Sequence, residues 1–200
     1  MSSDNHTFLF TSLSSKEPST ARKLHIRRLC DLLYLSIQRN DYERAKRAWC
    51  ILARCKEFKW MSMWKTALCI LGHPENGEKP QQENIEFLRT MLRQYPQDRE
   101  QILQELIANM IHAKQYRDAL DELDLYLPSL PYQDNATLNL YAGLISLYLA
   151  QGPPSEGGGN KPGYSNLQST LAAEARSHFE HARNLDPDNP IAQAFIDKAR

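Results

Sequence analysis

Hydrophobic residues recur along most of the chain with the three- and four-residue spacing of an amphipathic helix. In the first such segment Leu29, Leu32, Leu33 and Ser36 share one face, and comparable faces follow along the chain. Glycines, prolines and an Asn-Asp pair interrupt the pattern, which marks where helices end. The pattern predicts an all-α protein with helices over residues 24–39, 42–55, 59–71, 84–94, 99–113, 115–127, 137–151, 171–185 and 190–200.

The turns between several of these helices are short, so consecutive helices should lie antiparallel in pairs. About four helix pairs account for residues 21–200 as one array, and a final helix from Pro190 would cap its end. Residues 1–20 are rich in Ser and Thr and are predicted to form a disordered tail. Residues 153–168 are rich in Pro and Gly, so we expect a flexible insertion inside the last pair.

A small residue, a bulky residue four positions later and a following proline recur in the second helices of the predicted pairs. This spacing is typical of a tetratricopeptide-like (TPR-like) solenoid, in which small alanines let two helices cross closely. Arrays of this kind recognise partners rather than catalyse reactions. The positions that anchor the predicted repeats are Tyr42, Ala45, Trp49, Tyr116, Ala119, Ala175, Phe179, Ala182 and Pro187.

The formal net charge of zero hides two regions of opposite charge. Residues 21–65 contain 12 Lys and Arg against 4 Asp and Glu, a net of +8, whereas residues 66–200 contain 11 against 18, a net of −7. A basic surface on the first two helices is either simply solvated, or contacts DNA phosphates, or binds an acidic protein. The sequence leaves these alternatives open for Arg22, Lys23, Arg27, Arg28, Arg44, Arg47 and Arg54.

Side chains that could support catalysis or metal binding are present but poorly arranged for either. His178 and His181 lie one helical turn apart without a nearby ligand set, so a solvated helix face is the favoured interpretation. Asp121, Glu122 and Asp124 are interpreted as an ordinary polar helix face. The four cysteines lack the spacing of a zinc site, which predicts buried thiols. We therefore expect no catalytic residues, no cofactor and no metal.

Long apolar stretches are absent from the sequence. None approaches the ~20 consecutive apolar residues of a membrane-spanning helix, and residues 1–20 lack the pattern of a secretion signal. No membrane contact is expected.

Two blocks of sequence closely resemble a known family, the fungal TPR-type subunit of the RNA polymerase I core factor. The first block reads LHIRRLCDLL at 24–33, QRNDYERA at 38–45 and AWCILAR at 48–54. The second reads YRDALDEL at 116–123, YLP at 126–128 and PYQDN at 131–135. The resemblance covers roughly residues 24–150.

This resemblance implies a non-enzymatic, nucleolar subunit of a three-subunit core factor that assembles on the ribosomal DNA promoter and recruits RNA polymerase I. The implied partners are the other core factor subunits, RNA polymerase I and TATA-binding protein, with promoter DNA contacted through its phosphates. One alternative is a chaperone-type TPR adaptor, although Cys30 and Tyr34 occupy places where that family needs Lys and Asn. The other alternative is an enzyme whose site leaves no recognisable motif.

Overall fold

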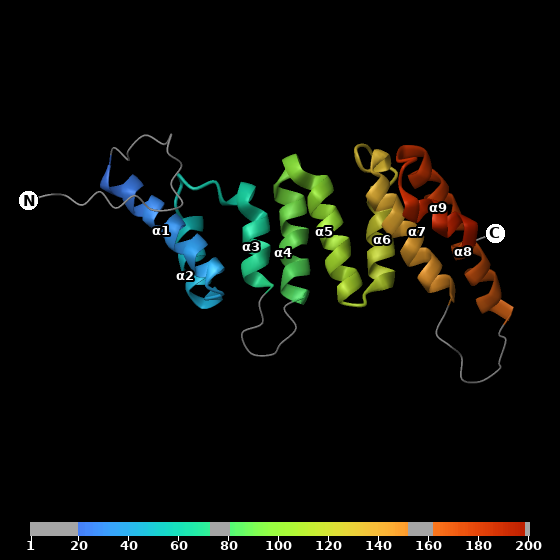
Figure 1. Cartoon of the computed structure of the whole chain (residues 1–200). Coiled ribbons are helices and arrows are strands. Elements are labelled where there is room, and N and C mark those ends of the chain that lie inside the picture. Colours follow the sequence, from blue (N-terminus) through green and yellow to red (C-terminus); the bar gives the residue numbers. More distant parts are fainter. Residues whose placement is uncertain (1–19, 73–80, 152–161, 199–200) are drawn as a thin grey trace, which may run out of the picture. The chain divides into compact units, whose positions relative to one another are not determined.

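The computed structural model describes residues 20–72, 81–151 and 162–198, and within these ranges every regular element is a helix (Figure 1). The predicted all-α class is confirmed. The chain divides into two compact units, residues 1–84 and 85–200, and each unit is described by itself. Residues 1–19, which make up nearly all of the predicted tail, lie outside the described residues, whereas Thr20 caps the first helix.

The first unit is built on a helical hairpin followed by a shorter helix. Helix α1 spans Ala21–Gln38, α2 spans Tyr42–Ala53, and a 3₁₀ turn η1, Trp60–Met63, leads into α3, Trp64–Leu71. One core cluster of this unit consists of buried aliphatic side chains from α1, α2 and α3, with Trp49 and Phe58 packed against its edge, and Trp64 and Ala67 of α3 are buried as well. The buried residues of the cluster are Leu33, Ala45, Ala48, Leu52 and Ile70.

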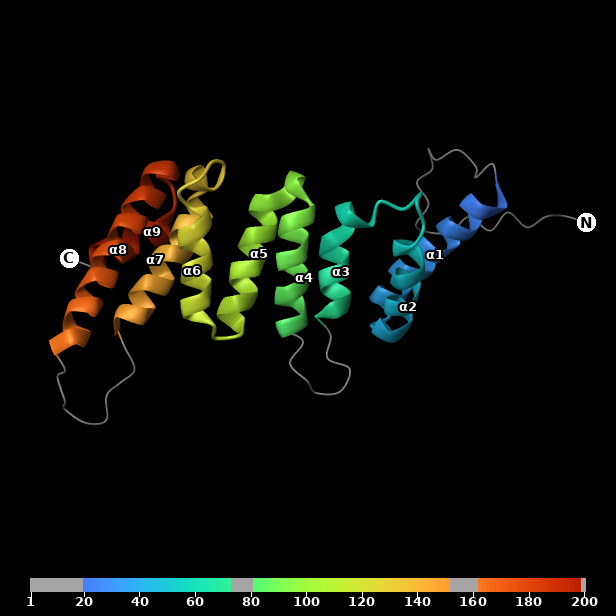
Figure 2. The same cartoon turned by 180° about the vertical axis from the view of Figure 1, so that it is seen from behind.

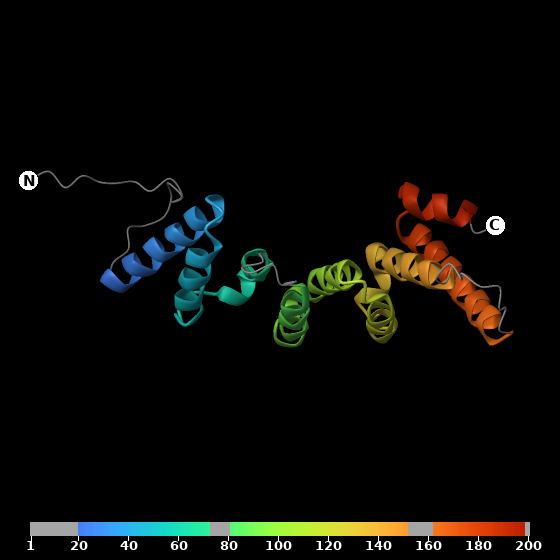
Figure 3. The same cartoon turned by 90° about the horizontal axis from the view of Figure 1, so that it is seen from below.

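The second unit continues with further helices. Helix α4, Gln81–Gln94, crosses the unit boundary, and the elements that follow it are η2 (Pro96–Asp98), α5 (Arg99–His112), α6 (Tyr116–Tyr126), η3 (Tyr132–Asp134), α7 (Ala136–Gln151), α8 (Pro162–Leu185) and α9 (Pro190–Lys198). Figure 2 shows α5 to α8 following one another in chain order. Seen from below, α5 and α7 lie in one row and α6 in the other, next to the part of α4 that belongs to this unit (Figure 3).

Helices α1 and α2, and helices α5 and α6, are joined by the same backbone turn. Asn40 and Lys114 adopt left-handed conformations with φ of 58° and 61°. In each turn the following residue donates its backbone N–H five residues back, from Asp41 to Ser36 and from Gln115 to Met110, both at 2.9 Å. These bonds are those of a Schellman motif, which satisfies the last carbonyls of a helix while reversing the chain. The turns fix the antiparallel pairing that the short connections predicted.

Replacing Lys114 with glycine should raise the free energy of unfolding by about 0.5–1 kcal/mol. A left-handed conformation strains any side chain that has a Cβ, and this strain outweighs the backbone entropy that glycine loses on folding. The measurement is urea denaturation followed by far-UV circular dichroism. Lys114→Ala is the matched control, since it removes the same charge but keeps the Cβ. An equal gain in Lys114→Ala would contradict the argument.

Helices α7 and α8 cross closely at a glycine. A Cβ placed on Gly143 would lie 2.8 Å from Cε1 of Phe179, which is closer than real Cβ contacts allow. The Phe179 ring is fully buried and stacks on Phe195 of α9, with ring centroids 5.3 Å apart. Buried Ala175 and Ala182 on the same side of α8 keep the rest of this crossing narrow.

Asn135 links α5 to the start of α7. Its Oδ1 accepts the backbone N–H groups of Thr137 and Leu138 at 3.1 and 3.2 Å, which caps α7. The same oxygen accepts a hydrogen bond from Gln104, and the Nδ2 of Asn135 donates to Glu100 at 3.1 Å. One side chain therefore fixes both the beginning of α7 and its position against α5.

The structure corrects two predicted boundaries. The flexible insertion was expected to extend through residue 168, but α8 begins at Pro162, and residues 153–161 lie outside the described residues. Proline suits the first turn of a helix because that turn has no use for its missing N–H, so Pro162 starts a helix rather than preventing one. The helix predicted over 59–71 is a 3₁₀ turn before Trp64, as is common at helix ends.

Candidate partner-binding surfaces

The second helix of the first unit carries an arginine-rich outward face. Arg44, Arg47 and Arg54 are exposed and follow one another at spacings of three and seven residues, with Ile51 on the same stripe. The opposite face of α2 is buried through its small and aliphatic residues. Because one face of α2 is required for the core, its arginines are left on the surface, and we refer to Arg44, Arg47, Ile51 and Arg54 as the α2 face.

Two of these arginines already form ion pairs within their own helix. Arg44 Nε lies 3.4 Å from Asp41 Oδ2, and Arg47 Nη2 lies 3.3 Å from Glu43 Oε2. Exposed pairs of this kind contribute only about 0.3–0.5 kcal/mol each, because water and salt screen them. An incoming phosphate or carboxylate can therefore replace these partners at little cost.

The basic residues of α1 do not all share one side. Lys23 and Arg27, four residues apart, lie on one face, whereas Arg22 and Arg28 point in other directions. Arg22 Nε lies 2.7 Å from Oε1 of Glu57, which follows α2. That hydrogen bond and charge raise the pKa of Arg22 and lower the pKa of Glu57. Arg22 thus closes the hairpin rather than extending the α2 face.

The predicted repeat anchors occupy the helix crossings, apart from a few at their edges. Tyr42 and Trp49 are half-buried, and Trp49 meets Phe58 edge-on. Tyr116 pairs with Tyr148 of α7 at 4.5 Å between ring centroids, while Pro187 is exposed just after α8. The fully buried anchors are Ala45, Ala119, Ala175, Phe179 and Ala182. Gly143 and Asn135 were missed, although a lone glycine inside an apolar helix was a usable signal of close packing.

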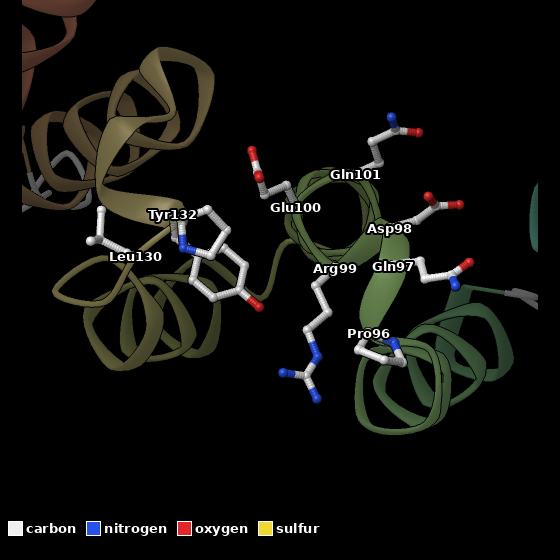
Figure 4. A pocket seen from close by; sticks show the side chains of 9 residues that line it. Pro96, Gln97, Asp98, Arg99, Glu100, Gln101, Leu130 and Tyr132 are labelled. Carbon is white, nitrogen blue, oxygen red and sulfur yellow. The ribbon is translucent and has the colours of Figure 1, made fainter.

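A shallow hollow of about 300 Å³ lies where the start of α5 meets the segment after α6 (Figure 4). Arg99 and Glu100 extend from α5, and Leu130 and Tyr132 come from the opposite side. Burial raises the pKa of the Tyr132 hydroxyl. The lining offers a mixed polar and apolar surface without a nucleophile paired to a base.

The histidines of α8 are less solvated than the sequence suggested. His178 is half-buried, and burial lowers its pKa although Asp124 of α6 and Glu174 act in the opposite direction. Burial likewise raises the pKa of Asp124. His181 Nε2 lies 3.2 Å from the backbone oxygen of Gln133. Throughout the described residues, no group of three or more His, Cys, Asp or Glu is placed to hold a metal ion.

The prediction of buried thiols is wrong: none of the four cysteines is fully buried. Cys50 and Cys69 are exposed, whereas Cys30 and Cys55 are half-buried and burial raises the pKa of Cys30. The exposed pair lies on helix faces turned away from the core, a feature that the cysteine count alone could not reveal. Within the part of the chain that is described, no helix has the length and apolar character to span a bilayer.

Comparison with known proteins identifies the class of this helical scaffold. The sequence pattern of the family described as RNA polymerase I-specific transcription initiation factor Rrn11 matches residues 9–106. A protein of Schizosaccharomyces pombe named RNA polymerase I-specific transcription initiation factor rrn11 is 31% identical over 143 residues, which cover 66% of this chain and 69% of that protein. No solved structure matches the chain significantly. The chain belongs to the Rrn11 family of RNA polymerase I-specific transcription initiation factors.

Proposed function

We propose that this chain is a non-enzymatic subunit of the RNA polymerase I core factor. It acts in the nucleus with other components of the initiation machinery, and more narrowly in the nucleolus, where it assembles at the ribosomal DNA promoter and helps to recruit RNA polymerase I. Its partners include the other core factor subunits and TATA-binding protein. The observation that carries this proposal is membership in the Rrn11 family.

The helices belong, in this proposal, to one TPR-like array that spans residues 21–200. Three features support it. The α1–α2 and α5–α6 pairs share one turn geometry, and Pro131 follows Ala119 at the same distance as Pro187 follows Ala175. The close approach of Gly143 to Phe179 also fits the glycine and bulky residue that this repeat places at its helix crossing.

The proposed role as a core factor subunit can be tested by reconstitution. Removing this chain from a purified initiation system should abolish promoter-specific transcription by RNA polymerase I, and adding the recombinant chain should restore it. Transcription by RNA polymerase II in a parallel system is the control and should be unchanged. Restoration by a preparation that lacks this chain would refute the proposal.

The α2 face is proposed to contact promoter phosphates. Reversing Arg44 and Arg47 to Glu should weaken promoter binding of the assembled factor, and should reduce the slope of log affinity against log salt by about 2 if both arginines neutralise phosphates. The measurement is a salt titration of binding to labelled promoter DNA. Both residues are exposed, so the fold should survive.

Arg176→Glu is a closely matched control for Arg47→Glu. Arg176 is exposed and pairs with Glu180 four residues later at 3.0 Å, much as Arg47 pairs with Glu43. Both substitutions break the same kind of local ion pair, but only Arg47 belongs to the α2 face. If the reversed α2 face gives the affinity and salt slope of the wild type, its arginines are merely solvated. Lost subunit assembly with an unchanged salt slope would instead identify an acidic protein partner.

A further inference from the structure

The outward face of α6, formed by Asp118, Asp121 and Leu125 and called the α6 face below, reverses the charge of the first part of the α2 face, and Pro128 stands at the position that corresponds to Arg54. The left-handed turn residues that precede the two helices are Asn40 and Lys114, which are 74 positions apart. With this offset Arg44 corresponds to Asp118, Arg47 to Asp121 and Ile51 to Leu125. At the shared aliphatic position Ile51 is 48% exposed and Leu125 is 69% exposed. Two helices in equivalent local settings therefore present an exposed aliphatic residue among charges of opposite sign.

The α6 face borders a surface hollow whose far wall is α4. The hollow has a volume of about 310 Å³ and is lined by Arg89, Asp118, Asp121, Glu122 and Leu125. Arg89 Nη2 lies 3.1 Å from Glu122 Oε1, so Glu122 is already neutralised. Asp118 and Asp121 have no ion-pair partner among the described residues, and they lie on the same side of α6 as Leu125.

The composition of this face defines what fits on it. Leu125 is 69% exposed, so covering it with another apolar group removes apolar surface from water, and the neighbouring unpaired carboxylates favour a cation. Nucleic acid is disfavoured because its phosphates would be repelled. Asp118 and Leu125 are seven residues apart, which is about 10 Å along the helix and matches two turns of a partner helix.

We propose that the α6 face docks a cationic amphipathic helix of another protein, whose aliphatic side chain packs on Leu125 and whose Arg or Lys residues pair with Asp118 and Asp121. A second copy of this chain, whose α2 face carries Arg44 and Arg47, is the alternative occupant, and the measurements below distinguish it from another protein. The docking surface is separate from the proposed promoter contact and does not depend on it.

A designed peptide tests this docking with the full chain. The probe is an alanine-based helix that carries Arg, Arg, Ile and Arg at the spacing of the α2 face, and its matched control replaces each Arg with Glu. Binding is measured by fluorescence anisotropy of the labelled peptide. The Arg peptide should bind in a salt-dependent manner, and Asp118→Asn with Asp121→Asn should weaken it about tenfold. Leu125→Ser should weaken it by a similar factor.

The control variant is Asp134→Asn with Asp188→Asn, which removes two exposed carboxylates of the same unit that lie outside α6. Equal weakening in this control, or equally tight binding of the Glu peptide, would show only general charge attraction and overturn the proposal. Sedimentation velocity of the full chain should show a monomer at all concentrations used. Self-association that Asp118→Asn and Asp121→Asn abolish would make a second copy the occupant and would also overturn it.

Discussion

Replacing Gly143 with alanine should lower the free energy of unfolding by about 1–2 kcal/mol, and replacing it with leucine should lower it by about 3 kcal/mol. In an ordinary helix the alanine substitution would instead stabilise by about 1 kcal/mol, because glycine loses more backbone entropy on folding. At Gly143 the stability change has the opposite sign, because the new Cβ would lie 2.8–3.0 Å from three ring atoms of Phe179. That ring cannot easily yield, since it is fully buried and stacked on Phe195.

The measurement is urea denaturation followed by circular dichroism, with a second substitution as the control. In a Phe179→Leu background the ring atoms are absent, so Gly143→Ala should lose most of its penalty. The two substitutions would then show a coupling free energy, as expected for residues in direct contact. A stabilising Gly143→Ala in the wild-type background would contradict the close crossing of α7 and α8.

Replacing Ala45 with leucine should lower the free energy of unfolding of the first unit by about 1–3 kcal/mol. Ala45 is fully buried in the cluster that contains Leu33 and Leu52, where α1 and α2 are packed together. Three additional carbons have no space there, so the helices must separate or neighbouring side chains must leave their preferred rotamers.

Tryptophan fluorescence during urea denaturation is the appropriate readout, because Trp49, Trp60 and Trp64 all belong to the first unit. Ala172→Leu is the control, since Ala172 is exposed on α8 and its substitution adds the same carbons to a surface position. It should change stability by less than about 0.5 kcal/mol. A midpoint for Ala45→Leu that equals the wild-type value would refute the assignment of Ala45 to a helix crossing.

The proposed surfaces share one structural origin. Each repeat-like pair needs one face of its second helix for packing, and this requirement leaves the opposite face free to vary in charge. In residues 44–54 this outward face carries arginines, whereas in residues 118–125 it carries carboxylates. The backbone turn stays the same in both. One scaffold therefore offers two chemically different outward faces without a change in its core.

Local signals in the sequence determined the class of fold and most of the helices. Apolar spacing, the capping Asp41 and the prolines act within a few residues, so they can be interpreted without knowledge of the distant chain. The buried alanines at 45 and 119 followed from the same spacing. The family resemblance also rested on contiguous residues, and the comparison with known proteins confirmed the family, whereas the TPR-like arrangement stays a proposal.

Only the tertiary structure decided which side chains meet across helices. Gly143 and Phe179 are 36 positions apart in the sequence, and Asn135 and Glu100 are 35 positions apart. No local pattern connects residues at such separations. The exposure of Leu125 and the neutralisation of Glu122 by Arg89 likewise depend on how α4 lies against α6. The spacing of apolar residues determines which face of a helix turns inward. Packing between distant segments determines which helix covers that face and which charged and apolar side chains stay exposed for a partner.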